Sequence, residues 1–178
     1  MAKKMLINVT EREIGALLFP NLELAIQQME NELCEAMEWE DDEKEELLRI
    51  GREEYGVDYG IEKTSAWANA DDGDKNCDWS IFDITKPFVL ISVVDREIAI
   101  SEFNTLEEAQ IAMLEDFKEC PDWDAWEEDF KLGEETNEYG VHKTSAWANA
   151  DDGDMDCDWS IIDIEKLEKI QKECEETS

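Results

Sequence analysis

The chain contains one stretch twice, and this repeat limits the folds that the sequence can adopt. Residues 63–84 read KTSAWANADDGDKNCDWSIFDI, and residues 143–164 read KTSAWANADDGDMDCDWSIIDI. Only three of these 22 positions differ: Lys75/Met155, Asn76/Asp156 and Phe82/Ile162. Because nearly identical stretches favour the same local structure, the chain is predicted to contain two copies of one structural unit.

The similarity continues on the N-terminal side of each copy, at a spacing of 84 residues that drops to 80 after Val57. The segment MLINVTEREI from Met5 parallels VLISVVDREI from Val89. Two copies are too few for a solenoid. We therefore predict two tandem modules and a C-terminal helical tail, with boundaries at 1–86, 87–166 and 167–178.

Each module is predicted to begin with a β-hairpin and a helix. In the first copy, apolar runs at 5–9 and 14–18 flank a polar turn, which is typical of a hairpin. Apolar residues at helical spacing follow from Leu22 onwards. In the second copy, Thr105 and Glu108 form a capping-box pattern at the start of the matching helix.

A second, acidic segment is also predicted to be helical, over 40–54 in the first copy and 124–137 in the second. Two further strands, 64–70 and 77–84 in the first copy, then complete the module. The predicted fold class is α+β, with two tandem ββα(α)ββ modules, each a four-stranded antiparallel sheet with a helix packed on one face.

The repeated stretch itself is predicted to be a hairpin. SAWANA is a strand, and DDGD is its turn, in which Gly73 and Gly153 supply the positive backbone angle that such turns need. We expect the two tryptophans of each copy to pair across the hairpin: Trp67 with Trp79, and Trp147 with Trp159.

The net charge is far larger than solubility requires. The sequence has 49 Asp and Glu residues against 16 Lys and Arg residues, a formal net charge of -33, whereas about 2–8 charges keep a small domain soluble. A hydrophobic share of 42% and 7 tryptophans predict a folded core. Such a surface repels nucleic acids and anionic membranes. It attracts basic surfaces, of which nucleic-acid-binding grooves are the commonest in a cell.

The cysteines and the N-terminal segment predict a cytoplasmic protein. The number of cysteines is odd, none lies in a CxxC pair, and no secretory signal is visible, so we expect reduced thiols: Cys34, Cys77, Cys120, Cys157 and Cys174. No apolar stretch approaches the roughly 20 residues of a membrane span.

The aspartates of the predicted turns leave a calcium-binding function open as an alternative. Asp72, Asp74, Asn76 and Asp78 alternate like the first ligands of a Ca²⁺ loop, as do Asp152, Asp154, Asp156 and Asp158. An EF-hand also needs a glycine at its sixth position and a glutamate at its twelfth, and both copies lack them. We interpret these clusters as solvated acidic turns, and we expect no metal site and no cofactor.

Catalysis is not indicated by the sequence. Paired carboxylates, as in glycoside hydrolysis, have no specificity in so acidic a chain. His142 is the one histidine, and no nucleophile–histidine–acid set or phosphate-binding loop accompanies it. We therefore expect a protein that is not an enzyme.

Nucleic-acid mimicry is the function that the charge pattern favours. Carboxylates at i and i+4 on a helix lie about 5–6 Å apart, comparable to the phosphate spacing along a strand, and segments 30–46 and 114–130 are dense in them. The hairpin turns add two more clusters, and two tryptophans could anchor the contact. The predicted partner-binding residues are Glu40, Asp41, Asp42, Asp71, Asp72, Asp74, Asp78, Asp122, Trp123, Asp124, Trp126, Asp151, Asp152, Asp154, Asp156 and Asp158.

In size, charge and lack of a catalytic motif, the chain resembles the small acidic antirestriction and anti-CRISPR proteins of phages and mobile elements. The resemblance covers composition and carries over no functional residues. It implies an inhibitor that occupies the basic nucleic-acid-binding site of a defence nuclease, such as a CRISPR effector or a restriction nuclease, without binding nucleic acid itself. The alternatives are a general protein-interaction or adaptor module and the Ca²⁺-binding module.

Overall fold

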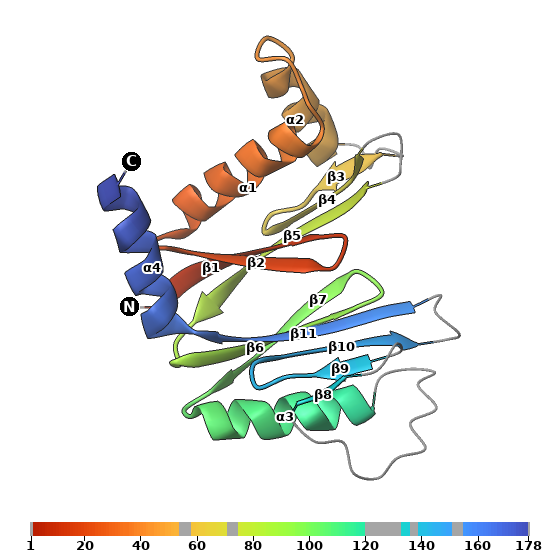
Figure 1. Cartoon of the computed structure of the whole chain (residues 1–178). Coiled ribbons are helices and arrows are strands. Elements are labelled where there is room, and N and C mark those ends of the chain that lie inside the picture. The colour runs from red at the N-terminus through yellow and green to blue at the C-terminus, as the bar shows by residue number, and fades with distance from the viewer. Residues whose placement is uncertain are drawn as a thin grey trace. The chain divides into compact units, whose positions relative to one another are not determined.

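The protein consists of two compact units, Met1–Ile84 and Thr85–Ser178. The computed structural model describes residues 2–53, 58–70, 75–119, 133–135, 139–150 and 155–177. Each unit is built on one antiparallel sheet with a helix packed against it (Figure 1). The predicted α+β class with two similar sheet modules is confirmed.

The first unit has a five-stranded sheet in the order β2-β1-β5-β4-β3. Helix α1 packs against four of these strands, and α2 contacts β3. The strands are β1 (Lys3–Thr10), β2 (Glu13–Phe19), β3 (Tyr59–Ile61), β4 (Ser65–Ala70) and β5 (Lys75–Ile84), and the helices are α1 (Leu22–Ala36) and α2 (Lys44–Glu53).

The second unit has a six-stranded sheet in the order β7-β6-β11-β10-β9-β8. Helix α3 packs against β6, β7, β10 and β11, and α4 continues directly from β11. The strands are β6 (Phe88–Val94), β7 (Glu97–Phe103), β8 (Glu134–Glu135), β9 (Tyr139–Val141), β10 (Ser145–Ala150) and β11 (Met155–Asp163), and the helices are α3 (Leu106–Lys118) and α4 (Ile164–Thr177).

Short polar side chains set the start of the main helix in each unit. Asn21 Oδ1 accepts a hydrogen bond from the Leu24 amide at 3.0 Å at the start of α1. At the start of α3, Thr105 Oγ1 accepts from the Glu108 amide at 3.2 Å, and the Glu108 carboxylate accepts from the Thr105 amide. Each cap satisfies amides that the first helical turn leaves without partners. The predicted capping box is confirmed.

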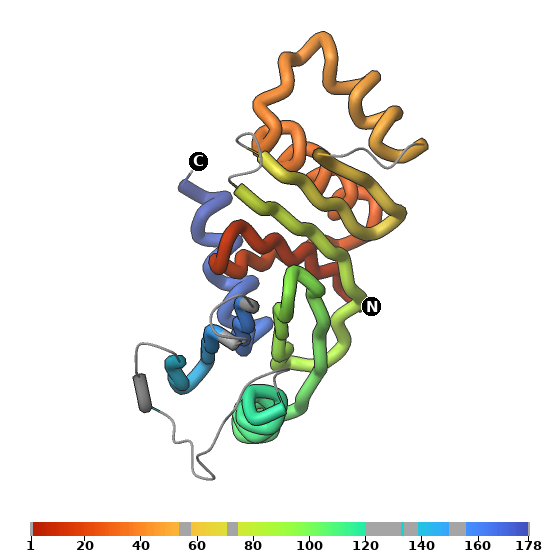
Figure 2. Tube along the Cα trace, turned by 90° about the vertical axis from the view of Figure 1, so that its right-hand side faces the viewer, coloured from red at the N-terminus to blue at the C-terminus, as the bar shows by residue number. Residues whose placement is uncertain are grey.

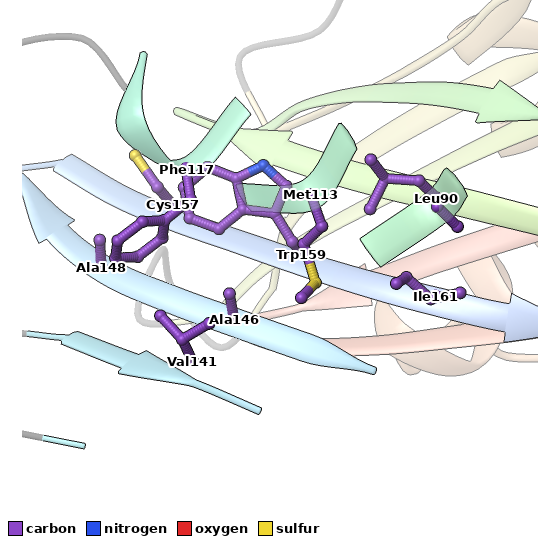
Figure 3. Packing of buried hydrophobic residues seen from close by; sticks show 10 residues of the cluster. Leu90, Met113, Phe117, Val141, Ala146, Ala148, Cys157, Trp159 and Ile161 are labelled. Atoms are coloured by element: carbon purple, nitrogen blue, oxygen red, sulfur yellow. The ribbon is translucent and has the colours of Figure 1, made fainter. Parts of the chain in front are cut away.

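The helix and the repeated hairpin form the core of each unit. In unit 2, Met113 and Phe117 of α3 pack on Ala146, Ala148 and Trp159 of the hairpin (Figure 3). The corresponding core of unit 1 contains Ala25, Met29, Leu33, Ala66, Ala68, Cys77 and Trp79. Alternate residues of each hairpin therefore face the helix, and the intervening residues lie on the opposite face of the sheet.

The structure corrects three details of the predicted module. Both sheets gain short strands that the sequence pattern does not predict, β3 in unit 1 and β8 and β9 in unit 2, because three residues or fewer are too short to show an alternating pattern. The helix predicted over 40–54 is confirmed for 44–53. The one predicted over 124–137 is wrong at Glu134–Glu135, which is a strand, and its other residues, apart from Gly133, lie outside the described part of the chain.

Candidate partner-binding surface

The structure describes only part of the predicted partner-binding set. Glu40, Asp41 and Asp42 lie between α1 and α2, whereas Asp78 lies on β5, and Asp156 and Asp158 lie on β11. The remaining predicted residues lie outside the described residues: Asp71, Asp72, Asp74, Asp122, Trp123, Asp124, Trp126, Asp151, Asp152 and Asp154.

The connection between α1 and α2 presents the first group. We call residues 37–43 the acidic corner, and Figures 1 and 2 show that it projects away from the sheet of unit 1. Trp39 anchors it, because the indole ring packs edge-on against Tyr59, with 4.7 Å between ring centroids. The Glu43 amide donates to the Glu40 carbonyl at 3.0 Å and closes a turn. The carboxylates of Glu40, Asp41 and Asp42 are therefore presented to solvent by an ordered turn, and all three residues are exposed.

The cations near the acidic corner are engaged in local ion pairs. Lys44 Nζ donates to Asp41 Oδ1 at 2.7 Å, and this hydrogen bond lowers the pKa of Asp41 below its ordinary value. On α2, Arg49 pairs with Glu46 and Glu53. Residues 38–53 contain eight acidic and three basic side chains, a net charge of -5. The corner and α2 therefore remain strongly negative after every one of these cations has been neutralised.

The second group lies on the sheet face opposite the helix. The register places Asp78 across from Trp67, and Asp158 across from Trp147. All four residues are half-buried. The expected pairing of the two tryptophans in each copy is therefore wrong.

A shift of one residue in register explains this correction. Trp79 lies opposite Ala66, and Trp159 opposite Ala146, on the helix-facing side of the sheet. Neighbouring positions along a strand point to opposite faces, so a one-residue difference separates the two rings of each copy. Trp67 and Trp147 were missed as surface residues, although the alternation of tryptophan with alanine in SAWANA could have revealed them.

One carboxylate of the predicted helical row faces the sheet instead of solvent. Glu32 of α1 accepts hydrogen bonds from Asn8 Nδ2 at 2.8 Å, Trp79 Nε1 at 2.9 Å and Gln28 Nε2 at 3.0 Å. Glu30, two residues earlier, pairs with Arg52. Segment 30–46 therefore does not form one continuous outward row, whereas Glu40, Asp41 and Asp42 of the acidic corner are exposed.

In the described part of the chain, no group of three or more His, Cys, Asp or Glu side chains could hold a metal ion. His142 donates its backbone amide to the Ser145 carbonyl at 2.7 Å, which is a strand-end contact.

The reduced-thiol prediction is wrong for Cys157, which is disulfide-bonded. Disulfide formation requires two Cα atoms about 4.4–6.8 Å apart, a distance that spacing along the sequence does not reveal. Cys77, which matches Cys157 in the first copy, is a buried free thiol.

Comparisons with known proteins returned no relative. No family model, curated protein or solved structure matches the chain. Among the described residues, no helix is long and apolar enough to cross a membrane.

Proposed function

We propose that the protein is a non-enzymatic inhibitor that binds the basic nucleic-acid-binding site of a host-defence nuclease, such as a CRISPR effector or a restriction nuclease. In this proposal the carboxylates of the protein replace the phosphates of the nucleic acid. The exposed acidic corner is the described surface that makes the first contact.

The observation that carries the proposal is the position of the charge. The net charge is -33, and no polar or charged residue in the described part of the chain is buried. The described carboxylates are therefore at least partly exposed, where a partner can meet them, and the repulsion within so negative a chain opposes folding. A basic groove would relieve that repulsion and would be reached quickly, because opposite charges steer association.

The duplication supports the same function. Two similar modules in one chain bring a second contact close once the first has formed, and this effective concentration raises the overall affinity without any new type of contact. A nucleic-acid groove is long and carries repeated phosphate-binding residues, so a tandem protein suits it.

Capture from a bacterial lysate tests the proposal. The tagged protein is incubated at low salt, bound proteins are eluted with a salt gradient, and each fraction is identified by mass spectrometry. We expect a nuclease or another nucleic-acid-binding protein that elutes at moderate salt, because attraction between exposed charges is screened. A partner without a basic groove, retained at high salt, would instead support the adaptor function.

Two charge-matched variants show whether the acidic corner makes the contact. The first is Glu40→Gln/Asp41→Asn/Asp42→Asn, and the second removes three exposed carboxylates of α4, Glu173, Glu175 and Glu176, as glutamines. Both variants have the same net charge. We expect elution at clearly lower salt for the corner variant only. Equal shifts for both variants would show that the corner is not a specific contact.

A further inference from the structure

A row of three residues crosses the helix-free face of each repeated hairpin. In each unit, a glycine, a tryptophan and an aspartate occupy facing positions on three adjacent strands. We call this the Gly–Trp–Asp row, and its members are Gly60, Trp67 and Asp78 in unit 1, and Gly140, Trp147 and Asp158 in unit 2.

The glycine determines how the tryptophan lies. A Cβ atom on Gly140 would stand 2.3 Å from Trp147 Nε1 and 3.0 Å from its Cε2, so only glycine lets the indole lie against β9. Trp147 alternates along β10 with Ala146 and Ala148, which are buried under α3. The Trp147 indole therefore lies against the backbone of β9, on the face of the sheet opposite α3.

The two rows are identical in sequence, and of the ten matched core positions two differ between the units. Leu33 in the core of unit 1 corresponds to Phe117 in unit 2, and both are fully buried. Substitutions at surface positions usually change stability little, so packing alone would preserve the core and let the outer face vary. The core is indeed largely preserved, and the outer face of the hairpin differs at Asn76/Asp156 and Phe82/Ile162. The row is unchanged on that face, which is consistent with a contact to another molecule.

The chemistry of the row suits an arginine side chain. An indole face attracts a cation, and a carboxylate accepts two parallel hydrogen bonds from a guanidinium group. Side chains that face each other on adjacent strands have Cβ atoms about 4.5–5.5 Å apart. The Trp147 indole leans toward β9 and Asp158 lies on β11, so a guanidinium group that binds both would bridge across β10. Lysine is a compact point charge that stacks less well. A net charge of -33 disfavours any anionic occupant.

We propose that each Gly–Trp–Asp row binds one arginine side chain of the protein partner, with the guanidinium group over the indole and the aspartate as its counter-ion. The proposal rests on the proposed function, because it names the side chains through which a basic groove is recognised. It assigns to both units a contact separate from the acidic corner.

Peptide binding tests this inference without any nuclease. The probes are hexa-arginine and hexa-lysine, which carry the same charge, and a six-nucleotide oligothymidylate. In ¹H–¹⁵N spectra of the whole protein, hexa-arginine should shift the indole N–H signals of Trp67 and Trp147, while those of buried Trp79 and Trp159 stay in place. We expect hexa-arginine to bind several-fold more tightly than hexa-lysine, and the oligonucleotide not to bind.

Variants that keep the net charge distinguish binding at the Gly–Trp–Asp row from general electrostatic attraction. Trp67→Leu/Trp147→Leu keeps the net charge and should weaken hexa-arginine binding about three- to thirty-fold. Gly140→Ala keeps the tryptophan and aspartate side chains of the row but displaces the Trp147 indole, so it should also weaken binding. It serves as the second test if the leucine variant fails to fold.

The aspartates have their own matched control. Asp78→Asn/Asp158→Asn should weaken hexa-arginine binding more than Glu175→Gln/Glu176→Gln, which removes the same charge from α4. The inference would be overturned if hexa-arginine and hexa-lysine bound equally tightly and the variants of the row bound hexa-arginine as tightly as their controls. So would binding of the oligonucleotide through the same indole signals. Either result leaves the acidic corner, and the proposed function, to be judged by the capture experiment.

Discussion

The hydrogen-bonded carboxylate of Glu32 gives the sharpest stability prediction, because the second unit supplies its own control. Glu32→Ala removes the acceptor shared by Trp79, Asn8 and Gln28. In unit 2, Asp116 occupies the position that corresponds to Glu32, 84 residues later, and its side chain is one methylene shorter. Trp159 corresponds to Trp79, and its Nε1 has no hydrogen-bond partner among the described residues. The same substitution at Asp116 therefore breaks no corresponding bond to the indole.

The magnitude follows from the burial of each donor. Trp79 is 3% exposed, so its indole N–H cannot be rehydrated, and leaving it unsatisfied costs about 1–3 kcal/mol. Asn8 is half-buried and its lost bond costs about 0.5–1 kcal/mol, while the i,i+4 pair with Gln28 contributes about 0.2–0.5 kcal/mol. The expected loss for Glu32→Ala is about 2–4 kcal/mol, against less than about 1 kcal/mol for Asp116→Ala.

Urea unfolding followed by circular dichroism measures both variants. Alanine raises the helix propensity at both positions, and the gain is larger at Asp116 because aspartate is the weaker helix former. The difference is below about 0.7 kcal/mol, which is smaller than the expected difference between the variants. Asp116→Glu adds a third test, since a longer side chain that reaches the Trp159 indole should raise the free energy of unfolding. The reasoning would be refuted if Glu32→Ala cost no more than Asp116→Ala.

Two further predictions concern unit 2. Thr105→Ala removes the hydroxyl that caps α3 and accepts from the Glu108 amide, so it should lower the free energy of unfolding by about 1 kcal/mol, whereas Thr105→Ser should cost much less in the same urea titration. At Glu102, desolvation raises the carboxyl pKa, but hydrogen bonds from Thr85 and Lys86 outweigh it, and the pKa lies below its ordinary value of 4.5. The stability from this carboxylate is then present above pH 4.5 and lost as the pH falls through the lowered pKa. Glu102→Gln should reduce the acid-induced loss of stability, and an unchanged pH profile would contradict the assignment.

The fold was largely predictable because its elements are repeated and their apolar residues recur at the spacing typical of a helix or a strand. The apolar runs at 5–9 and 14–18 became β1 and β2, and the helical spacing from Leu22 became α1. The acidic segments were harder to assign, because charged residues without an apolar stripe lack the hydrophobic periodicity that distinguishes a helix from a strand. Glu134–Glu135 is a strand for this reason, although it was predicted as part of a helix.

The candidate site was less predictable than the fold. Total charge is visible in the sequence, but the contacts of each carboxylate depend on neighbours brought from other elements. Glu32 illustrates this, because Asn8 and Trp79 lie on different strands and meet it only after folding. Likewise, the position of Trp67 across from Asp78 depends on a strand register that composition does not report.

The central claim is that this protein occupies a site made for nucleic acid. The most direct measurement starts from the partner protein captured from the lysate, with a fluorescent duplex or guide strand bound to it. This chain is then added, and the fluorescence anisotropy of the labelled nucleic acid is followed. The account predicts that the labelled nucleic acid is displaced and that added salt weakens the competition steeply. A ternary complex of partner, nucleic acid and this chain, with the label still bound, would contradict it.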